Sequence, residues 1–301
     1  MKTKTNLSID YLKICYRQPE GLFRVIASTQ EDLIPRLGYD LLITDRDDQR
    51  IILTVLMPDT SGQWSLGTLV LNNGNTFDGK AFFEFSNRSM YEVLSWLPGQ
   101  RPSNFIVLMD FIANDLGLKY NNCTRIDIAL DTTVNAVARI KKRKRDVDNL
   151  DMFLCRHRVT DPDLRLDDYG EFYGATRRRL LKHPEIIIKQ SKQEGTRLKV
   201  YDKSRELLES RPDKIERYYN WLGDGWDQDT DHIYRVEVSV RNEDLKEIWK
   251  KISKRLRPEE LDMPFLDQIQ TEKILAWYFF ESLESLVYFR DINTGEKVEP
   301  F

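Results

Sequence analysis

Histidine and cysteine are both scarce in this sequence, with 3 residues of each among 301. So few histidines limit any His-rich metal site. Cys15, Cys123 and Cys155 lie far apart and include no CxxC pair, which argues against a disulfide framework and a structural zinc site. No apolar run approaches the roughly 20 residues that span a bilayer. We therefore expect a cytoplasmic protein with reduced thiols and no membrane partner.

The charges nearly balance, since 46 Lys+Arg stand against 49 Asp+Glu and give a formal net charge of −3. This balance excludes a generic polycation that coats nucleic acid, but it allows a local basic site. A hydrophobic fraction of 41% indicates a globular protein. The length allows one large domain or two. We expect a sheet-based domain over 1–242, with pseudo-equivalent halves 1–120 and 121–242, and a helical region over 243–301.

Short β-type runs separated by turn signals make the first half strand-rich. The runs are Leu7–Cys15, Leu41–Thr44, Ile51–Leu56, Leu66–Leu71 and Ala81–Phe85. Helical spacing follows after Ser103, around Val147–Arg156 and over Phe265–Phe289. This order of elements predicts an α+β fold with an antiparallel β-sheet and covering helices.

Three later segments share one design, in which apolar and charged side chains alternate along a strand. In the first, Ile126 and Ile128 point one way while Arg125, Asp127 and Asp131 point the other. The charged sides of the other two strands carry Arg197, Lys199, Tyr201 and Lys203, and Arg235, Glu237, Ser239 and Arg241. Period-two alternation gives each strand an aliphatic face and a charged face. On periodicity alone, the charged faces are solvent-facing sides of an antiparallel sheet.

If the three strands are neighbours, their charged faces form a carboxylate cluster beside a tyrosine that cations flank. Carboxylate oxygens suit Mg²⁺ or Mn²⁺, and Arg and Lys suit phosphate. A tyrosine hydroxyl, with an ordinary pKa near ~10, becomes a better nucleophile when cations favour its phenolate. The set predicts phosphodiester transesterification by Tyr201, assisted by Lys199 and Lys203. The sequence also lacks a glycine-rich phosphate loop, in agreement with a reaction that needs no ATP.

In this order, the stretches Thr124–Thr133, Arg197–Glu206 and Tyr234–Arg241 resemble the replication initiation factor family of rolling-circle plasmids and the related relaxases of integrative conjugative elements. Phe82–Ser86 and Ile9–Ile14 add weaker support. The resemblance implies a nicking fold distantly related to the HUH endonucleases. It also implies a site-specific, metal-dependent DNA nickase that rejoins its own nick.

On this resemblance Tyr201 is the nucleophile, and Asp127, Glu237 and Asp131 hold the Mg²⁺ or Mn²⁺ ion. The expected DNA contacts on the same strands are Arg125, Arg197, Lys199, Lys203 and Arg235. The implied partner is DNA, at an origin or transfer-origin hairpin that is single-stranded at the nick. A homodimer and a host helicase are left open as further partners.

The sequence departs from the family pattern because it has no His-hydrophobic-His pair, so carboxylates must replace a plain HUH metal site. His232, which precedes the Glu237 strand, is a better candidate for an added ligand than His157 or His183. Strand pattern begins almost at once, without the N-terminal helix-turn-helix domain that conjugative relaxases of the group often carry. This favours a replication initiator.

Two basic runs, 139–145 and Arg177–Arg179, either contact DNA phosphates or are solvated surface loops. The predicted contacts in these runs are Lys141, Lys142, Arg143, Arg177, Arg178 and Arg179. Tyr218 and Tyr219 are rival nucleophiles, although helix packing explains them better.

Three alternatives remain open to the leading function. One is a conjugative relaxase of the same family. Another is a non-catalytic DNA-binding regulator, whose carboxylates would be structural ion-pair partners of Arg125 and Arg235. The third is a carboxylate-metal nuclease that needs no tyrosine. Dependence of DNA cutting on chelator and on Tyr201 separates these classes.

Overall fold

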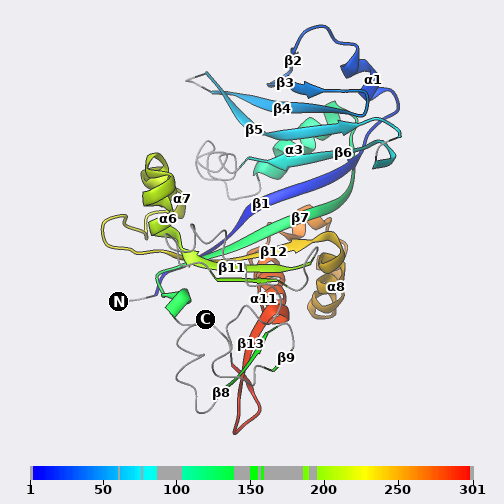
Figure 1. Ribbon diagram of the computed structural model, residues 1–301. Helices are drawn as coiled ribbons and strands as arrows, with labels where there is room; N and C mark the ends of the chain where they lie inside the picture. The colour runs from blue at the N-terminus through cyan, green and yellow to red at the C-terminus, as the bar shows by residue number, and fades with distance from the viewer. Residues whose placement is uncertain are drawn as a thin grey trace. The chain divides into compact units, whose positions relative to one another are not determined.

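The computed structural model describes residues 3–59, 62–75, 77–86, 104–138, 150–154, 157–158, 186–189 and 195–298. It confirms an α+β fold with a large antiparallel sheet and several helices (Figure 1). Unit 1 comprises Met1–Ile9 and Asp127–Phe301, and unit 2 comprises Asp10–Ile126. Strands β1 (Thr5–Arg17) and β7 (Lys119–Thr132) contribute residues to both units. The expected boundary between a sheet-based domain over 1–242 and a helical region over 243–301 stays a prediction.

Unit 2 is built on an antiparallel sheet with the hydrogen-bonded order β1-β6-β5-β4-β3-β2. Its other elements are α1 (Leu22–Ala27), β2 (Leu33–Arg36), β3 (Tyr39–Arg46), β4 (Arg50–Asp59), β5 (Gly62–Asn72), the 3-10 turn η1 (Phe77–Gly79), β6 (Lys80–Phe85) and α3 (Asn104–Asp115). All five strands predicted for the first half are present, and each extends beyond its apolar run.

Alternate side chains of the unit 2 sheet lie in two different environments. Leu41, Leu53 and Phe83 have no exposed surface. The Tyr39 hydroxyl, on the same face as Leu41, donates to Asp115 Oδ2 at 2.6 Å at the end of α3. Helix α3 therefore covers this face, with its own apolar stripe turned toward the strands. The other face of the sheet is half-exposed.

Unit 1 contains the strand order β10-β11-β12-β7-β1. Its elements are β10 (Ile186–Lys189), β11 (Arg197–Asp202), α6 (Lys203–Ser210), η3 (Pro212–Lys214), α7 (Ile215–Leu222), β12 (Tyr234–Arg241), α8 (Asn242–Ile252), η4 (Ser253–Arg255), α9 (Pro258–Leu261), α10 (Phe265–Gln268) and α11 (Glu272–Leu286). Helices α8 and α11 pack on β12 (Figure 1), and the valines of β12 are fully buried.

A second, four-stranded sheet in unit 1 overturns two helix predictions. Its strands are β8 (Leu150–Leu154), β9 (His157–Arg158), β13 (Val287–Asp291) and β14 (Lys297–Val298). The helix predicted around Val147–Arg156 is wrong, because Leu150–Leu154 pairs with β13; so short an apolar run does not distinguish helix from strand. The helix predicted over Phe265–Phe289 is interrupted after Gln268 and ends at Leu286, where β-branched and aromatic residues continue as a strand.

Cys15 and Cys123 are buried thiols. Within the described ranges, no helix is long and apolar enough to cross a membrane. Some segments named from the sequence lie outside the described residues, among them Ser103 and Cys155.

A substitution at Gly67 in β5 tests how closely the unit 2 sheet is packed. A Cβ added there would clash with the backbone oxygen of Glu84 and lie 2.9 Å from the ring of Phe83. We expect Gly67→Ala to lower the free energy of unfolding by roughly 1–3 kcal/mol, measured by urea denaturation. The matched control is Gly74→Ala, because no atom lies within 4 Å of a Cβ at Gly74. Equal midpoints for the two variants would contradict this packing.

Candidate functional site

Strand pairing places the three charged segments side by side in unit 1. Across the antiparallel β11–β12 pair, the opposed residues are Tyr201 with Arg235, Lys199 with Glu237, and Arg197 with Ser239. The next strand in the sheet is β7, which carries Asp127 and Asp131. The strands are therefore neighbours, the arrangement that a shared site requires.

Two side-chain contacts set the alignment of β7 against β12. Arg235 donates from Nε to Asp131 Oδ1 at 2.8 Å and from Nη2 to Asp131 Oδ2 at 2.9 Å. The Ser239 hydroxyl donates to Asp127 Oδ1. Because Asp131 lies beside Arg235 and Asp127 lies beside Ser239, period-two alternation puts Ala129 beside Glu237. We call this the three-row face; its rows are Tyr201–Arg235–Asp131, Lys199–Glu237–Ala129 and Arg197–Ser239–Asp127.

The charged side of β7 and β12 is buried, so the expectation of a solvent-facing surface is wrong for these two strands, whereas Arg197, Lys199 and Tyr201 on β11 are half-exposed. Arg235 and Asp131 are 0% exposed, and Asp127 and Glu237 are 3% exposed. A buried charge without a partner costs several kcal/mol, so burial requires pairing. Lys199 Nζ accordingly lies 3.0 Å from Glu237 Oε1. Period-two alternation alone gives no measure of this burial.

A lysine and two tyrosines form one end of the three-row face. Strand β11 ends at Asp202, whose side chain caps α6, so Lys203 begins the helix instead of continuing the strand face as predicted. Its Nζ lies 5.9 Å from the ring centroid of Tyr201 and 5.4 Å from that of Tyr218. Both rings therefore share one buried cation, which also pairs with Glu206 at 2.6 Å.

Tyr218 has a role that the sequence did not indicate. It is 3% exposed on α7, and its hydroxyl accepts a hydrogen bond from Arg235 Nη2 at 2.8 Å. The expected packing on a helix is correct, but the phenol also completes the coordination of the guanidinium. The sequence contains no signal for this contact, because Tyr218 and Arg235 are 17 positions apart.

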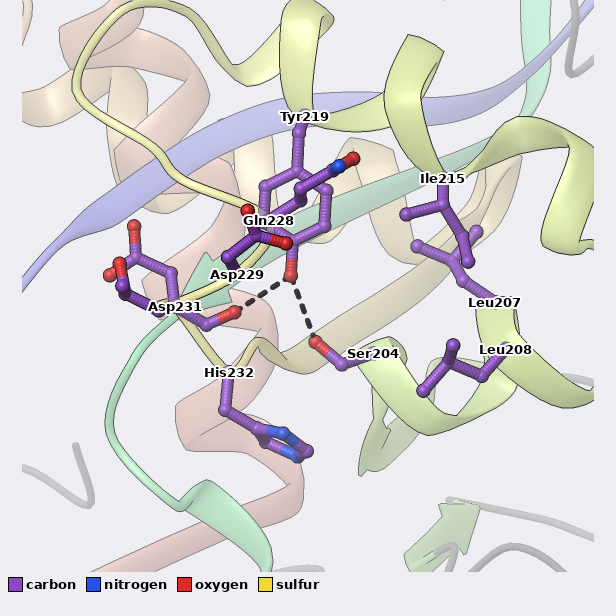
Figure 2. Close-up of a pocket in the computed structure, with 10 residues that line it drawn as sticks. Ser204, Leu207, Leu208, Ile215, Tyr219, Gln228, Asp229, Asp231 and His232 are labelled. Atoms are coloured by element: carbon purple, nitrogen blue, oxygen red, sulfur yellow. Dashed lines mark hydrogen bonds between the residues drawn. The ribbon is translucent and has the colours of Figure 1, made fainter.

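Tyr219 faces a cavity of about 180 Å³ bounded by α6, α7 and the loop that leads to β12 (Figure 2). Its hydroxyl donates to the backbone oxygen of Asp231 at 2.7 Å and lies 3.1 Å from Ser204 Oγ. Burial raises the pKa of Tyr219, the hydrogen bond with Ser204 lowers it, and the charge of Asp231 raises it further. The raised pKa disfavours the phenolate that a nucleophile requires, and the hydrogen bond to the backbone gives Tyr219 a structural contact.

The loop beside the cavity is held by an ion pair and by a side-chain hydrogen bond. Lys4 Nζ lies 2.6 Å from Asp231 Oδ2, and the Asp231 side chain is almost fully buried. His232 Nε2 lies 2.8 Å from Asp202 Oδ2. His232, the expected added metal ligand, therefore contacts the residue that caps α6.

The acids expected to hold a divalent ion do not fit that role as a set. In the described part of the chain, no group of three His, Cys, Asp or Glu side chains could hold a metal ion. Both oxygens of Asp131 accept from Arg235, Glu237 pairs with Lys199, and Asp127 accepts from Ser239. These acids therefore serve as ion-pair and hydrogen-bond partners within the sheet.

Several residues predicted to contact DNA are not among the described residues of the three-row face. Arg125 belongs to unit 2, where its guanidinium carbon lies 4.4 Å from the ring centroid of Tyr11. The side chain of His157 and the whole of His183 are not described. The basic-run residues that lie outside the described residues are Lys141, Lys142, Arg143, Arg177, Arg178 and Arg179.

Comparison with known proteins gives a distant structural relative. No family model matches the chain, and no curated protein matches it. The chain is similar to the solved structure of a rolling circle replication initiator protein from Geobacillus stearothermophilus, with 12% sequence identity and a TM-score of 0.42. The match covers 99% of this chain and 94% of that chain. By itself, a similarity this distant assigns neither a fold nor a function.

The Arg235–Asp131 pair generates a stability prediction. We expect Asp131→Asn to lower the free energy of unfolding by about 3–5 kcal/mol, because it leaves a buried guanidinium without a counter-charge. Urea denaturation monitored by circular dichroism measures the loss. The control is Glu243→Gln, which breaks the solvent-exposed pair with Lys246 and should leave stability nearly unchanged. Similar midpoints for both variants would show that the buried pair is not structural.

Proposed function

We propose that this protein nicks and rejoins one DNA strand as a rolling-circle replication initiator, with Tyr201 as its nucleophile. The observation that carries the proposal is the position of Tyr201, which pairs with Arg235 across the strands and whose ring centroid lies 5.9 Å from Lys203 Nζ. Cations beside a phenol favour the phenolate, which is the nucleophilic form. The resemblance of the three strand segments to replication initiation factors supports the same assignment.

In the proposed reaction, the Tyr201 oxygen attacks the phosphorus of a phosphodiester. A tyrosine–phosphate bond forms, and the bond between phosphorus and the leaving deoxyribose oxygen breaks. The phenolic proton passes to that oxygen, through solvent or directly, and yields a free hydroxyl. Because the bond energy stays in the phosphotyrosine link, attack by a hydroxyl rejoins the strand without ATP. Lys199 and Arg197, half-buried on the same face, are the cations proposed to contact the phosphate.

A second candidate is a DNA-binding regulator without catalysis, and the ion pairs of the three-row face favour it. Asp131 is the structural partner of Arg235, as this alternative requires. Glu237 and Asp127 also have partners within the sheet. Under this candidate the rows hold the strands together, and Tyr201 is a sheet aromatic.

One assay tests both candidates. The full chain is incubated with labelled single-stranded oligonucleotides of random sequence and Mg²⁺ or Mn²⁺, and adducts are resolved on a denaturing gel. We expect a covalent adduct in the wild type that disappears in Tyr201→Phe, because the attacking oxygen is gone. The matched control is Tyr120→Phe in unit 2, which removes the hydroxyl of a tyrosine that is 42% exposed and should leave the adduct unchanged.

Each other outcome has one meaning. An adduct that persists in Tyr201→Phe would reject Tyr201 as the nucleophile. Cutting without an adduct would identify a nuclease that needs no covalent step. DNA binding that is insensitive to chelator, with no cutting in any variant, would select the regulator.

A further inference from the structure

The described residues on the other face of the unit 2 sheet, opposite α3, are mostly half-exposed. Residues on β1, β6, β5 and β4 lie opposite one another on this face and form rows across the strands. The rows are Lys13–Glu84–Thr68–Thr54 and Cys15–Phe82–Val70–Ile52. Every one of these residues except Cys15 is half-exposed, whereas their sequence neighbours on the α3 side are buried. We call this surface the open face.

Aromatic rings and cations alternate on the open face. The ring of Phe77 is 67% exposed and meets Phe82 edge-to-face at 5.8 Å. Lys13 Nζ lies 5.9 Å from the Phe82 ring centroid. On the adjoining part of β1, the Arg125 guanidinium lies 4.4 Å from the ring centroid of Tyr11, close enough to stack on it. Such ring and guanidinium surfaces offer planar platforms for unpaired bases.

The backbone holds Phe77 in an unusual conformation. Its φ is 50°, and that of Asp78 is 53°, so two consecutive non-glycine residues adopt the left-handed region. This region is strained for a bulky side chain and must be stabilised by its surroundings. Here the turn keeps a phenyl ring at the surface beside Phe82 rather than in the core. Strain of this kind is concentrated at binding sites.

The charges of the open face suit a phosphate backbone. Lys13 pairs with Glu84 at 3.3 Å, and Lys80 pairs with Asp78 at 3.1 Å. All four side chains are at least one-third exposed, so these pairs are weak and their lysines can also contact phosphate. Arg125 adds a further positive charge. The surface therefore combines cations with stacking platforms.

We propose that the open face of unit 2 binds single-stranded DNA, with a base stacked on Phe77 and phosphates near Lys13 and Arg125. Duplex DNA is a poorer fit, because its bases are stacked on one another and cannot reach a ring on a sheet. The proposal does not rest on Tyr201 or on cutting, since it concerns residues of unit 2 alone.

Fluorescence anisotropy of the full chain tests the proposal, with a labelled oligo(dT) of about 12 nucleotides. The buffer contains EDTA, so binding is measured without metal-dependent cutting and the result is independent of the proposed nickase. We expect Phe77→Ala to weaken binding on the order of tenfold, and Phe77→Trp to retain it. Lys13→Gln should reduce the slope of log affinity against log salt by about 0.7, the value for one lost phosphate contact.

The matched aromatic control is Phe111→Ala on α3, because that ring is 46% exposed and meets Tyr39 edge-to-face at 6.2 Å. The charge control is Lys250→Gln on α8, a lysine in an exposed pair. Both controls should bind as the wild type does. The proposal is overturned if Phe77→Ala binds like wild type, if Phe111→Ala loses as much affinity, or if a duplex of equal length shows the same dependence on Phe77.

Discussion

The arrangement of unit 1 depends on one buried guanidinium. Arg235 donates to the carboxylate of Asp131 on β7 and to the phenol of Tyr218 on α7, so a side chain of β12 joins three separate parts of the chain. Arginine stays protonated in proteins, so the Arg235 guanidinium always carries a positive charge and always needs its partners. Strand β11, and Tyr201 with it, takes its position from β12.

The two units use the same strand alternation for opposite purposes. In unit 1 the polar side of β7 and β12 is buried, and its acids are neutralised by partners within the sheet. In unit 2 the polar side is open and carries rings and lysines that solvent reaches. A buried network fixes the positions of the strands but keeps a ligand away from its side chains. An open face lets a flexible ligand contact the side chains. The proposed cutting of one DNA strand would use both properties.

Much of the sheet could be predicted from the sequence, because alternation is a local property. The strands from Leu7 to Phe85 and the three charged strands all follow from it. The depth of burial could not be predicted, because it depends on what covers each face. Asp131 is a candidate metal ligand by residue type alone, but its position opposite a buried arginine gives it an ion-pair role. The sequence predicts a helix at Leu150–Leu154 because the strand partner of this segment, β13, lies more than a hundred residues further along the chain.

The ion pair between Lys4 and Asp231 has a consequence for the order of folding. Unit 2 is one continuous stretch, Asp10–Ile126, and its strands can pair as soon as that stretch has been synthesised. Unit 1 joins Met1–Ile9 to residues beyond 126, so its first strand residues wait for partners made much later. Contacts of such high sequence separation fold slowly. During translation, unit 2 should therefore be complete while the first residues of the chain are still without their partners.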